Sequence, residues 1–67
     1  METLAARVQH YRLQKKLSVR ELAKLADVSV SYVYAIESGT RGNNIVKLER
    51  IASALDVPLQ ALWGGVR

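Results

Sequence analysis

One segment, SVRELAKLADVSVSYVYAIES (residues 18–38), constrains the fold of this chain more than any other part of it. Ser18 and Glu21 have the spacing of a capping box, in which each side chain bonds the other residue's backbone amide at the start of a helix. Asp27 interrupts that helix in a position where left-handed backbone geometry is tolerated. Ser29 then caps a second helix that runs to the end of the segment. The pattern predicts two short helices joined by a tight turn.

The second of these helices, residues 30–38, is predicted to bury one side and expose the other. On a helical wheel of about 100° per residue, Val33 and Ile36 define the buried side. Val30 lies at one edge of that side and Tyr32 at the other. The side chains expected to project away from the core are Ser31, Tyr34, Ala35 and Ser38. This helix therefore has a free face that a partner can contact.

The remaining sequence predicts three further helices and no strand. They are expected at residues 3–16, from Asn43 or Asn44 to about residue 55, and from Pro58 to residue 62 or 63. Pro58 suits the first turn of a helix because its missing amide hydrogen is not needed there. The apolar positions expected to meet in one core are Leu4, Val8, Tyr11, Leu22, Leu25, Ala26, Ile45, Leu48, Ile51, Ala52 and Leu55. The prediction is a single all-α, five-helix domain spanning residues 1–67.

Composition excludes several classes of protein. The chain has no cysteine, so it has neither disulfides nor thiolate metal sites. His10 is the only histidine and has no neighbouring ligand set, so we expect neither a metal nor any other cofactor. No apolar run approaches the roughly 18 residues of a membrane span. No signal segment opens the sequence. The expectation is a soluble, cytoplasmic protein without a membrane partner.

The distribution of charge favours a polyanionic partner. Ten Lys and Arg residues against six Asp and Glu residues give a net charge of +4. Basic surfaces attract nucleic acids. Six basic residues lie close together in the first part of the chain, opposed there only by Glu21: Arg7, Arg12, Lys15, Lys16, Arg20 and Lys24. Many domains carry such a charge only as a solvated face, so this signal needs support from the fold.

The sequence resembles the phage-repressor class of helix-turn-helix domains, also called the XRE or Cro-repressor family. The resemblance covers roughly residues 4–63. It rests on features that keep one register along the chain: Glu21-Leu22-Ala23, Val28-Ser29, Tyr32, Ile36-Glu37, Gly39, and the series Leu48, Ile51, Ala54-Leu55. It implies a lambda-repressor-like DNA-binding fold. It also implies a sequence-specific, double-stranded DNA-binding transcriptional regulator whose helix 30–38 enters the major groove.

The resemblance also implies roles for individual residues. The base contacts would fall on Val30, Ser31 and Ala35, with Tyr34 beside them. The phosphate contacts would come from Ser18, Arg20, Tyr32, Arg41, Asn43, Asn44 and Lys47. Related repressors pair an arginine of the first helix with a glutamate that ends the recognition helix, and those positions here are Arg12 and Glu37. We expect this pair to lock the two helices together.

The sequence departs from the family pattern where bases are read. The usual glutamine at the start of the motif's first helix is Val19 here, and the usual glycine of the turn is Asp27. The predicted base-facing residues lack the Arg, Asn and Gln side chains that make bidentate contacts. Recognition would then depend on thymine methyl groups, hydrogen bonds from hydroxyl groups and DNA shape. Weak discrimination per base, or specificity through paired sites, follows as a hypothesis.

The last residues predict self-association. Leu59, Leu62, Trp63 and Val66 form a dense apolar group for so short a tail. One interpretation is a two-fold dimer interface, which would place two recognition helices about 34 Å apart on a palindromic operator. The other interpretation is that Trp63 simply closes the core.

Two other classes of function are compatible with the sequence to different degrees. A protein-interaction module of the same fold that has lost DNA binding is favoured by the apolar surface of Val30, Tyr34 and Ala35. An enzyme is disfavoured, because Ser18 and Ser29 are explained as helix caps and have no neighbouring base. No effector domain for a small molecule is evident in the sequence.

Overall fold

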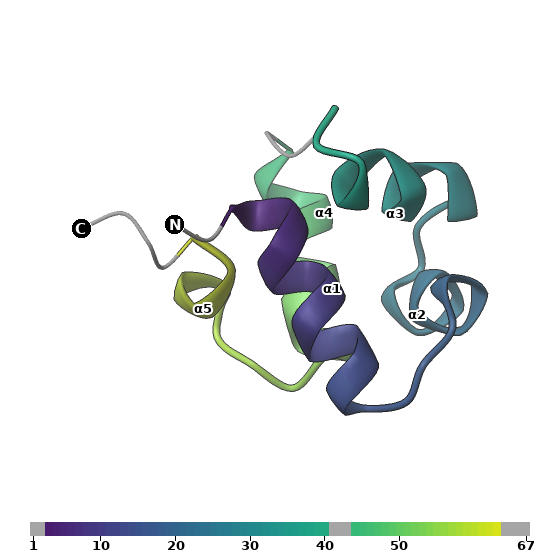
Figure 1. The fold of residues 1–67 in the computed structure, drawn as a ribbon, viewed down its shortest axis with the longest axis horizontal. Helices are drawn as coiled ribbons and strands as arrows, with labels where there is room; N and C mark the ends of the chain where they lie inside the picture. Colours follow the sequence, from purple (N-terminus) through teal and green to yellow (C-terminus); the bar gives the residue numbers. More distant parts are fainter. Residues whose placement is uncertain (1–2, 41–43, 64–67) are drawn as a thin grey trace.

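The computed structural model describes residues 3–40 and 44–63, which form five helices and no strand (Figure 1). The helices are α1 (Leu4–Gln14), α2 (Val19–Ala26), α3 (Val30–Glu37), α4 (Ile45–Ala54) and α5 (Leu59–Trp63). The prediction of an all-α, five-helix domain is confirmed for the described residues. The first helix ends two residues earlier than expected, and the recognition helix ends at Glu37 with Ser38 as its C-cap.

Side-chain caps set where the helices begin. The Ser18 hydroxyl accepts from the Glu21 amide at 3.0 Å, and the Glu21 carboxylate accepts from the Ser18 amide at 2.7 Å. This is the predicted capping box, and it satisfies two amides that the first turn of a helix leaves without partners. The Ser29 hydroxyl accepts from the amide of Tyr32 at 3.0 Å and begins α3 in the same way. Of the two asparagines proposed as the cap of α4, Asn44 has that role.

Four helices are followed, one or two positions after their last residue, by a residue with a left-handed backbone. These residues are Lys16, Asp27, Gly39 and Asp56, with φ between 57° and 85°. The amide after each of them donates to a carbonyl five residues earlier, as in the Schellman motif. After α1, α2 and α4 the following residue is Leu or Val, and it packs against the core. Short turns of this kind fix the direction of the next helix.

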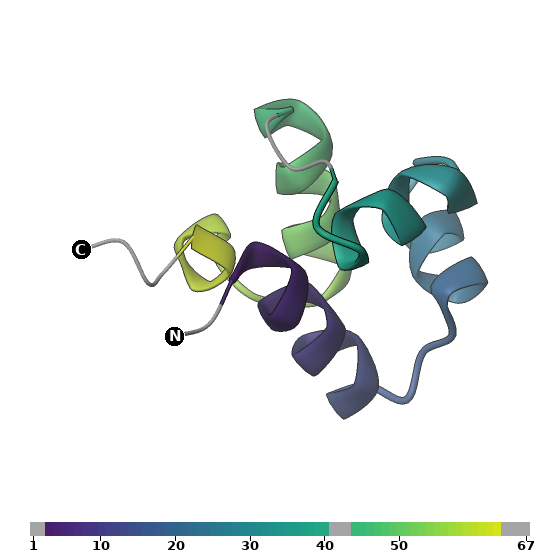
Figure 2. The same ribbon diagram turned by 45° about the horizontal axis from the view of Figure 1, so that its top comes forward.

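The helices enclose one core. α2 packs against α3 and α4, while α1 packs against α3 and α5, and α4 also contacts α5. Figure 1 shows α2 and α3 at one end of the molecule and α5 at the other, with α1 and α4 between them. Figure 2 shows α1 and α5 side by side. The buried apolar residues come from all five helices and the end of α4: Val8, Leu22, Ala23, Ala26, Tyr32, Val33, Ile36, Leu48, Ile51, Ala52, Leu55 and Leu62.

The prediction of the core is wrong for two residues. Leu25 is 62% exposed and Ile45 is 44% exposed. Leu25 lies on the outer side of α2, because the small residues Ala23 and Ala26 face the neighbouring helices instead. Ile45 is the first residue of α4, so it lies at the rim of the core. The helical periodicity therefore located the apolar stripes of α2 and α4, but it included one exposed residue at the edge of each stripe.

Candidate nucleic-acid interface

The outer face of α3 is the candidate reading surface. Ser31 is exposed, and Tyr34 is 59% exposed. Val30 and Ala35 are half-buried, and Val30 also packs against the core. The structure therefore places the four predicted base-contact residues on or beside one helix face. Two of them project freely, and the other two present only part of their surface.

Tyr32 is placed differently from its predicted role. Its side chain is 7% exposed, and its hydroxyl oxygen is buried. The Lys47 ammonium lies 4.8 Å from the centroid of its ring, a cation–π contact between α4 and α3. A buried hydroxyl cannot reach a phosphate outside the protein, so the predicted phosphate contact by Tyr32 does not fit this structure. The wheel placed Tyr32 at an edge of the buried side without showing that α4 covers it.

A small hollow adjoins the N-terminal half of α3. It has a volume of about 260 Å³ and is lined by Ser29, Ser31, Tyr32, Ala35 and Lys47. Two serine side chains and one ammonium group give it donors for an anion. The helix begins at the same place, and the positive end of its dipole favours negative charge.

The other predicted phosphate contacts divide into three groups. Arg20 is exposed on α2 and Lys47 is half-buried on α4. Ser18 and Asn44 are exposed, but both side chains cap helices, and the Ser18 amide already donates to Glu21. Arg41 and Asn43 lie outside the described residues. Arg20 and Lys47 are thus the described cations among the predicted contacts.

The structure contains the Arg12–Glu37 ion pair. The Arg12 Nε donates to one carboxylate oxygen of Glu37 at 2.7 Å and its Nη2 donates to the other at 3.0 Å. Nη1 donates to the carbonyl of Leu17 at 2.8 Å. Both side chains are about nine-tenths buried. The hydrogen bond to Glu37 raises the pKa of the Arg12 guanidinium above its ordinary value. This bidentate contact joins α1 to the C-terminal end of α3.

Among the residues predicted to form a dimer interface, those whose side chains the structure describes are at most partly exposed for contact with a second copy of the chain. Leu62 is 1% exposed in its own chain, so the expectation that it forms a dimer interface is wrong: it closes the core between α5 and its neighbours. Leu59 is half-buried and packs against the core. The side chain of Trp63 and all of Val66 lie outside the described residues. The large apolar residues that are exposed include Val46 at 59% and Leu13 at 58%.

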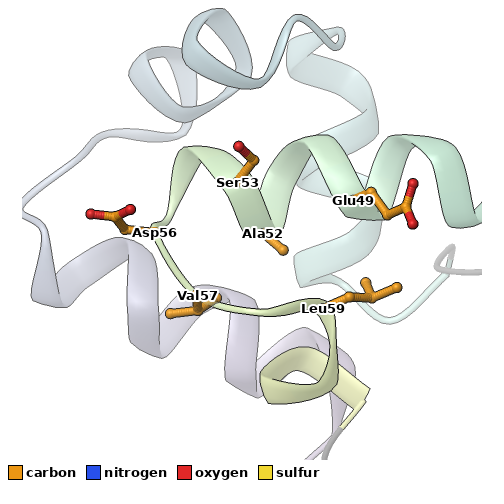
Figure 3. A pocket seen from close by; sticks show the side chains of 6 residues that line it. All are labelled: Glu49, Ala52, Ser53, Asp56, Val57 and Leu59. Carbon is orange, nitrogen blue, oxygen red and sulfur yellow. The ribbon is translucent and has the colours of Figure 1, made fainter.

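A second hollow lies away from α3. It has a volume of about 520 Å³ and lies beside α4 and the turn that follows it, lined by Glu49, Ala52, Ser53, Asp56, Val57 and Leu59. Figure 3 shows the carboxylates of Glu49 and Asp56 at its two ends. No group of three or more His, Cys, Asp or Glu side chains suited to a metal occurs in the described part of the chain.

Sequence reasoning missed two arginine contacts that hold helices in place. Arg7 Nη1 donates to the carbonyl of Ala61 at 2.9 Å and ties α1 to α5. Arg50 Nη1 donates to the carbonyl of Asp27 at 3.3 Å and reaches from α4 to the turn before α3. The sequence placed Arg7 only in a cluster of basic residues, and it predicted no contact for Arg50. No local pattern marks an arginine whose acceptor is a backbone carbonyl more than twenty residues away.

A capped helix with an exposed outer face, joined to a preceding helix by a tight left-handed turn, defines the class of helix-turn-helix proteins. The chain belongs to the helix-turn-helix family HTH_3, whose model matches residues 8–62. This confirms the resemblance to XRE-type regulators. Among the described residues, none of the helices has the length and the apolar character of a membrane span.

Comparison with known proteins agrees with this assignment. The transcriptional regulator SinR of Bacillus subtilis is 35% identical over 60 residues, which are 88% of this chain and 54% of SinR. The chain thus spans about half the length of this relative. A crystal structure of SinR in complex with DNA has a TM-score of 0.86 at 35% identity, over 91% of this chain and 98% of that one. The restriction-modification controller protein C.AhdI from Aeromonas hydrophila has a TM-score of 0.84 at 34% identity, over 88% and 89% of the two chains.

Proposed function

We propose that this chain is a sequence-specific, double-stranded DNA-binding transcriptional regulator that inserts α3 into the major groove. The observation that carries the proposal is the exposed face of α3, which a bidentate ion pair holds at one end and a tight turn holds at the other. A helix held in this way presents its side chains to a duplex at a fixed angle. The SinR structure with DNA supports this use of the fold.

The exposed residues of α3 determine which bases are read. Ser31 and Tyr34 are exposed and supply hydroxyl groups for hydrogen bonds to base edges. The half-buried Val30 and Ala35 offer methyl groups that pack against thymine. Because bidentate readers are absent from this face, DNA shape supplies part of the specificity.

Phosphate contacts set the register of α3 on the duplex. The hollow lined by Ser29, Ser31 and Lys47 suits a backbone phosphate beside the reading face. Arg20, exposed on α2, provides a second cation. The Ser18 hydroxyl and the Asn44 side chain, together with Arg41 and Asn43, remain proposed contacts. The hollow containing Glu49 and Asp56 has two carboxylates at its edge, which repel phosphate, so no DNA contact is proposed there.

The regulator acts as a homodimer on a palindromic operator, with an interface near the end of the chain. Leu59, Trp63 and Val66 remain its proposed residues, without the buried Leu62. One helix reads few base pairs, so a two-fold dimer doubles the contacted site. No enzymatic activity or small-molecule effector is proposed.

Selection of binding sites from random duplex DNA tests the proposal. We expect enrichment of a palindrome whose half-sites are about one helical turn, roughly 34 Å, apart. We also expect log K for the selected duplex to fall linearly with log salt, since phosphate contacts release counterions. Enrichment of a single half-site would overturn the dimer. The absence of any enriched duplex at low salt would overturn DNA binding.

A second candidate function is supported by the exposure of Tyr34, which is compatible with a protein-interaction module of the same fold. Such a module would retain affinity for a protein partner after Arg20→Met, whereas a DNA-binding domain would lose affinity for its duplex. The two candidates are thus separated by one substitution on the DNA-facing side.

A further inference from the structure

The turn between α2 and α3 carries backbone strain. Asp27 has φ 57° and ψ 47°, in the left-handed region that residues other than glycine seldom occupy. Asp tolerates this region better than most residues but does not reach the freedom of glycine. A strained residue keeps its conformation only where its surroundings hold it. The contacts around Asp27 therefore decide how sharply the direction of α3 is defined.

Local hydrogen bonds hold the start of this turn. The Asp27 amide donates to the carbonyls that end α2, and the Val28 amide donates to the Ala23 carbonyl at 3.0 Å. These bonds engage carbonyls that a helix end leaves without intrahelical partners. The carbonyl of Asp27 lies one step further along the chain, in the peptide group that leads into α3. It accepts its hydrogen bond from outside the motif, from Arg50 Nη1.

Arg50 reaches this carbonyl across a gap between α2 and α4. The gap is a hollow of about 580 Å³, and its lining residues are Leu25, Ala26, Asp27, Arg50, Ser53, Ala54 and Asp56. α2 and α4 pack against each other through small and apolar residues deeper in the core. At the surface the guanidinium spans the remaining distance. α4 is thereby connected to the peptide group between Asp27 and Val28, which lies in the turn from α2 into α3.

We propose that Arg50 is a positioning residue for DNA recognition, which fixes the angle between α2 and α3 by holding the Asp27 carbonyl. This role rests on the proposed DNA binding by α3. It differs from that of the proposed phosphate contacts, because Arg50 acts through the turn and makes no contact with DNA. Removing the guanidinium leaves the fold intact, since Arg50 is exposed, but broadens the range of angles that α3 samples.

The test compares Arg50→Met with Arg20→Met. Each substitution removes one exposed arginine and one positive charge, and both proteins are first checked for an unchanged helical circular dichroism spectrum. We expect each to bind the selected duplex about three- to tenfold more weakly, which is the size of effect that a typical net hydrogen bond contributes at an exposed site. The salt dependence separates them. The slope of log K against log salt falls by about 0.9 for Arg20→Met and stays at the parent value for Arg50→Met.

A measurement on the free protein completes the test. The amide of Val28 belongs to the peptide group whose carbonyl Arg50 holds, so its chemical shift and hydrogen exchange report the contact directly. We expect Arg50→Met to shift this resonance and speed its exchange, and Arg20→Met to leave both unchanged. A reduced salt slope for Arg50→Met, or an unchanged Val28 amide, overturns the proposal. If the parent protein binds no duplex, DNA binding fails, and the Val28 amide still decides whether Arg50 holds the turn.

Discussion

The turn between α2 and α3 and the turn between α4 and α5 are built from the same two residue types, Asp followed by Val. Asp27 and Asp56 both adopt left-handed conformations, with φ of 57° and 65°. In both turns the valine amide donates to a carbonyl five residues earlier at 3.0 Å. Val28 and Val57 both pack against the core. Locally, the two turns are close copies.

They differ in the contacts that reach them from elsewhere in the chain. Arg50 donates to the backbone carbonyl of Asp27, whereas Lys15 lies 3.7 Å from the side-chain carboxylate of Asp56. The Asp56 side chain is 84% exposed, so that ion pair constrains little. A contact to a backbone carbonyl restrains the path of the chain, and a contact to an exposed side chain does not. The turn that leads into the proposed reading helix is the one held at its backbone.

α3 is also held at its far end, by the ion pair between Arg12 and Glu37, and Glu37→Ala removes that contact. The substitution leaves the nine-tenths buried guanidinium of Arg12 without its carboxylate. Removing one partner of a buried pair costs roughly 3–5 kcal/mol. A domain of this size has only a few kcal/mol of stability. We therefore expect the variant to be largely unfolded at 25 °C, as measured by urea denaturation followed by circular dichroism.

Glu37→Gln is the matched control, because it keeps the shape and one hydrogen-bond acceptor but removes the charge. It should fall between the parent and Glu37→Ala. A loss below about 1 kcal/mol for Glu37→Ala, the size of an exposed pair, would show that the turn alone orients α3.

The substitutions Asp27→Gly and Asp56→Gly test whether the two turns are equally strained. Glycine removes the cost of a left-handed Cβ, about 1–2 kcal/mol for an ordinary residue, but loses more chain entropy on folding, about 0.5–1 kcal/mol. We expect both variants to gain roughly 0.5–1 kcal/mol of unfolding free energy in urea titrations. A gain at Asp56 together with a loss at Asp27 would mean that the Asp27 side chain itself supports the turn.

The sequence predicted the parts of the fold that depend on neighbouring residues. The capping box of Ser18 and Glu21, the Ser29 cap and the break at Asp27 all rest on contacts within a few positions, and each is present. The Arg12–Glu37 pair spans 25 residues and was predicted only through the family resemblance. Local sequence patterns therefore predicted the helices and their caps, and the family resemblance predicted one long-range contact.

The errors arose where packing between helices decides exposure. Leu25 and Leu62 are both apolar residues near the edge of a helix stripe, yet one is 62% exposed and the other 1%. A helical wheel gives the direction in which a side chain points from its helix, but it does not show which neighbouring element covers that side chain. Tyr32 shows the same limit, because Lys47 and the core cover a side chain that was expected to face DNA. The roles of the candidate base and phosphate contacts stay predictions, since they depend on a duplex.

Lys15→Met is expected to have little effect on stability or DNA binding. It removes the contact to Asp56, which is long and exposed, so we expect a change in unfolding free energy within about 0.5 kcal/mol. Affinity for the selected duplex should stay within about twofold of the parent, because neither the backbone of this turn nor α3 depends on the pair. Arg50→Met removes the same charge from the other turn and should weaken binding more. If the two variants weaken binding equally, net charge rather than the held carbonyl accounts for both effects, and the two turns are equivalent in function as well as in local structure.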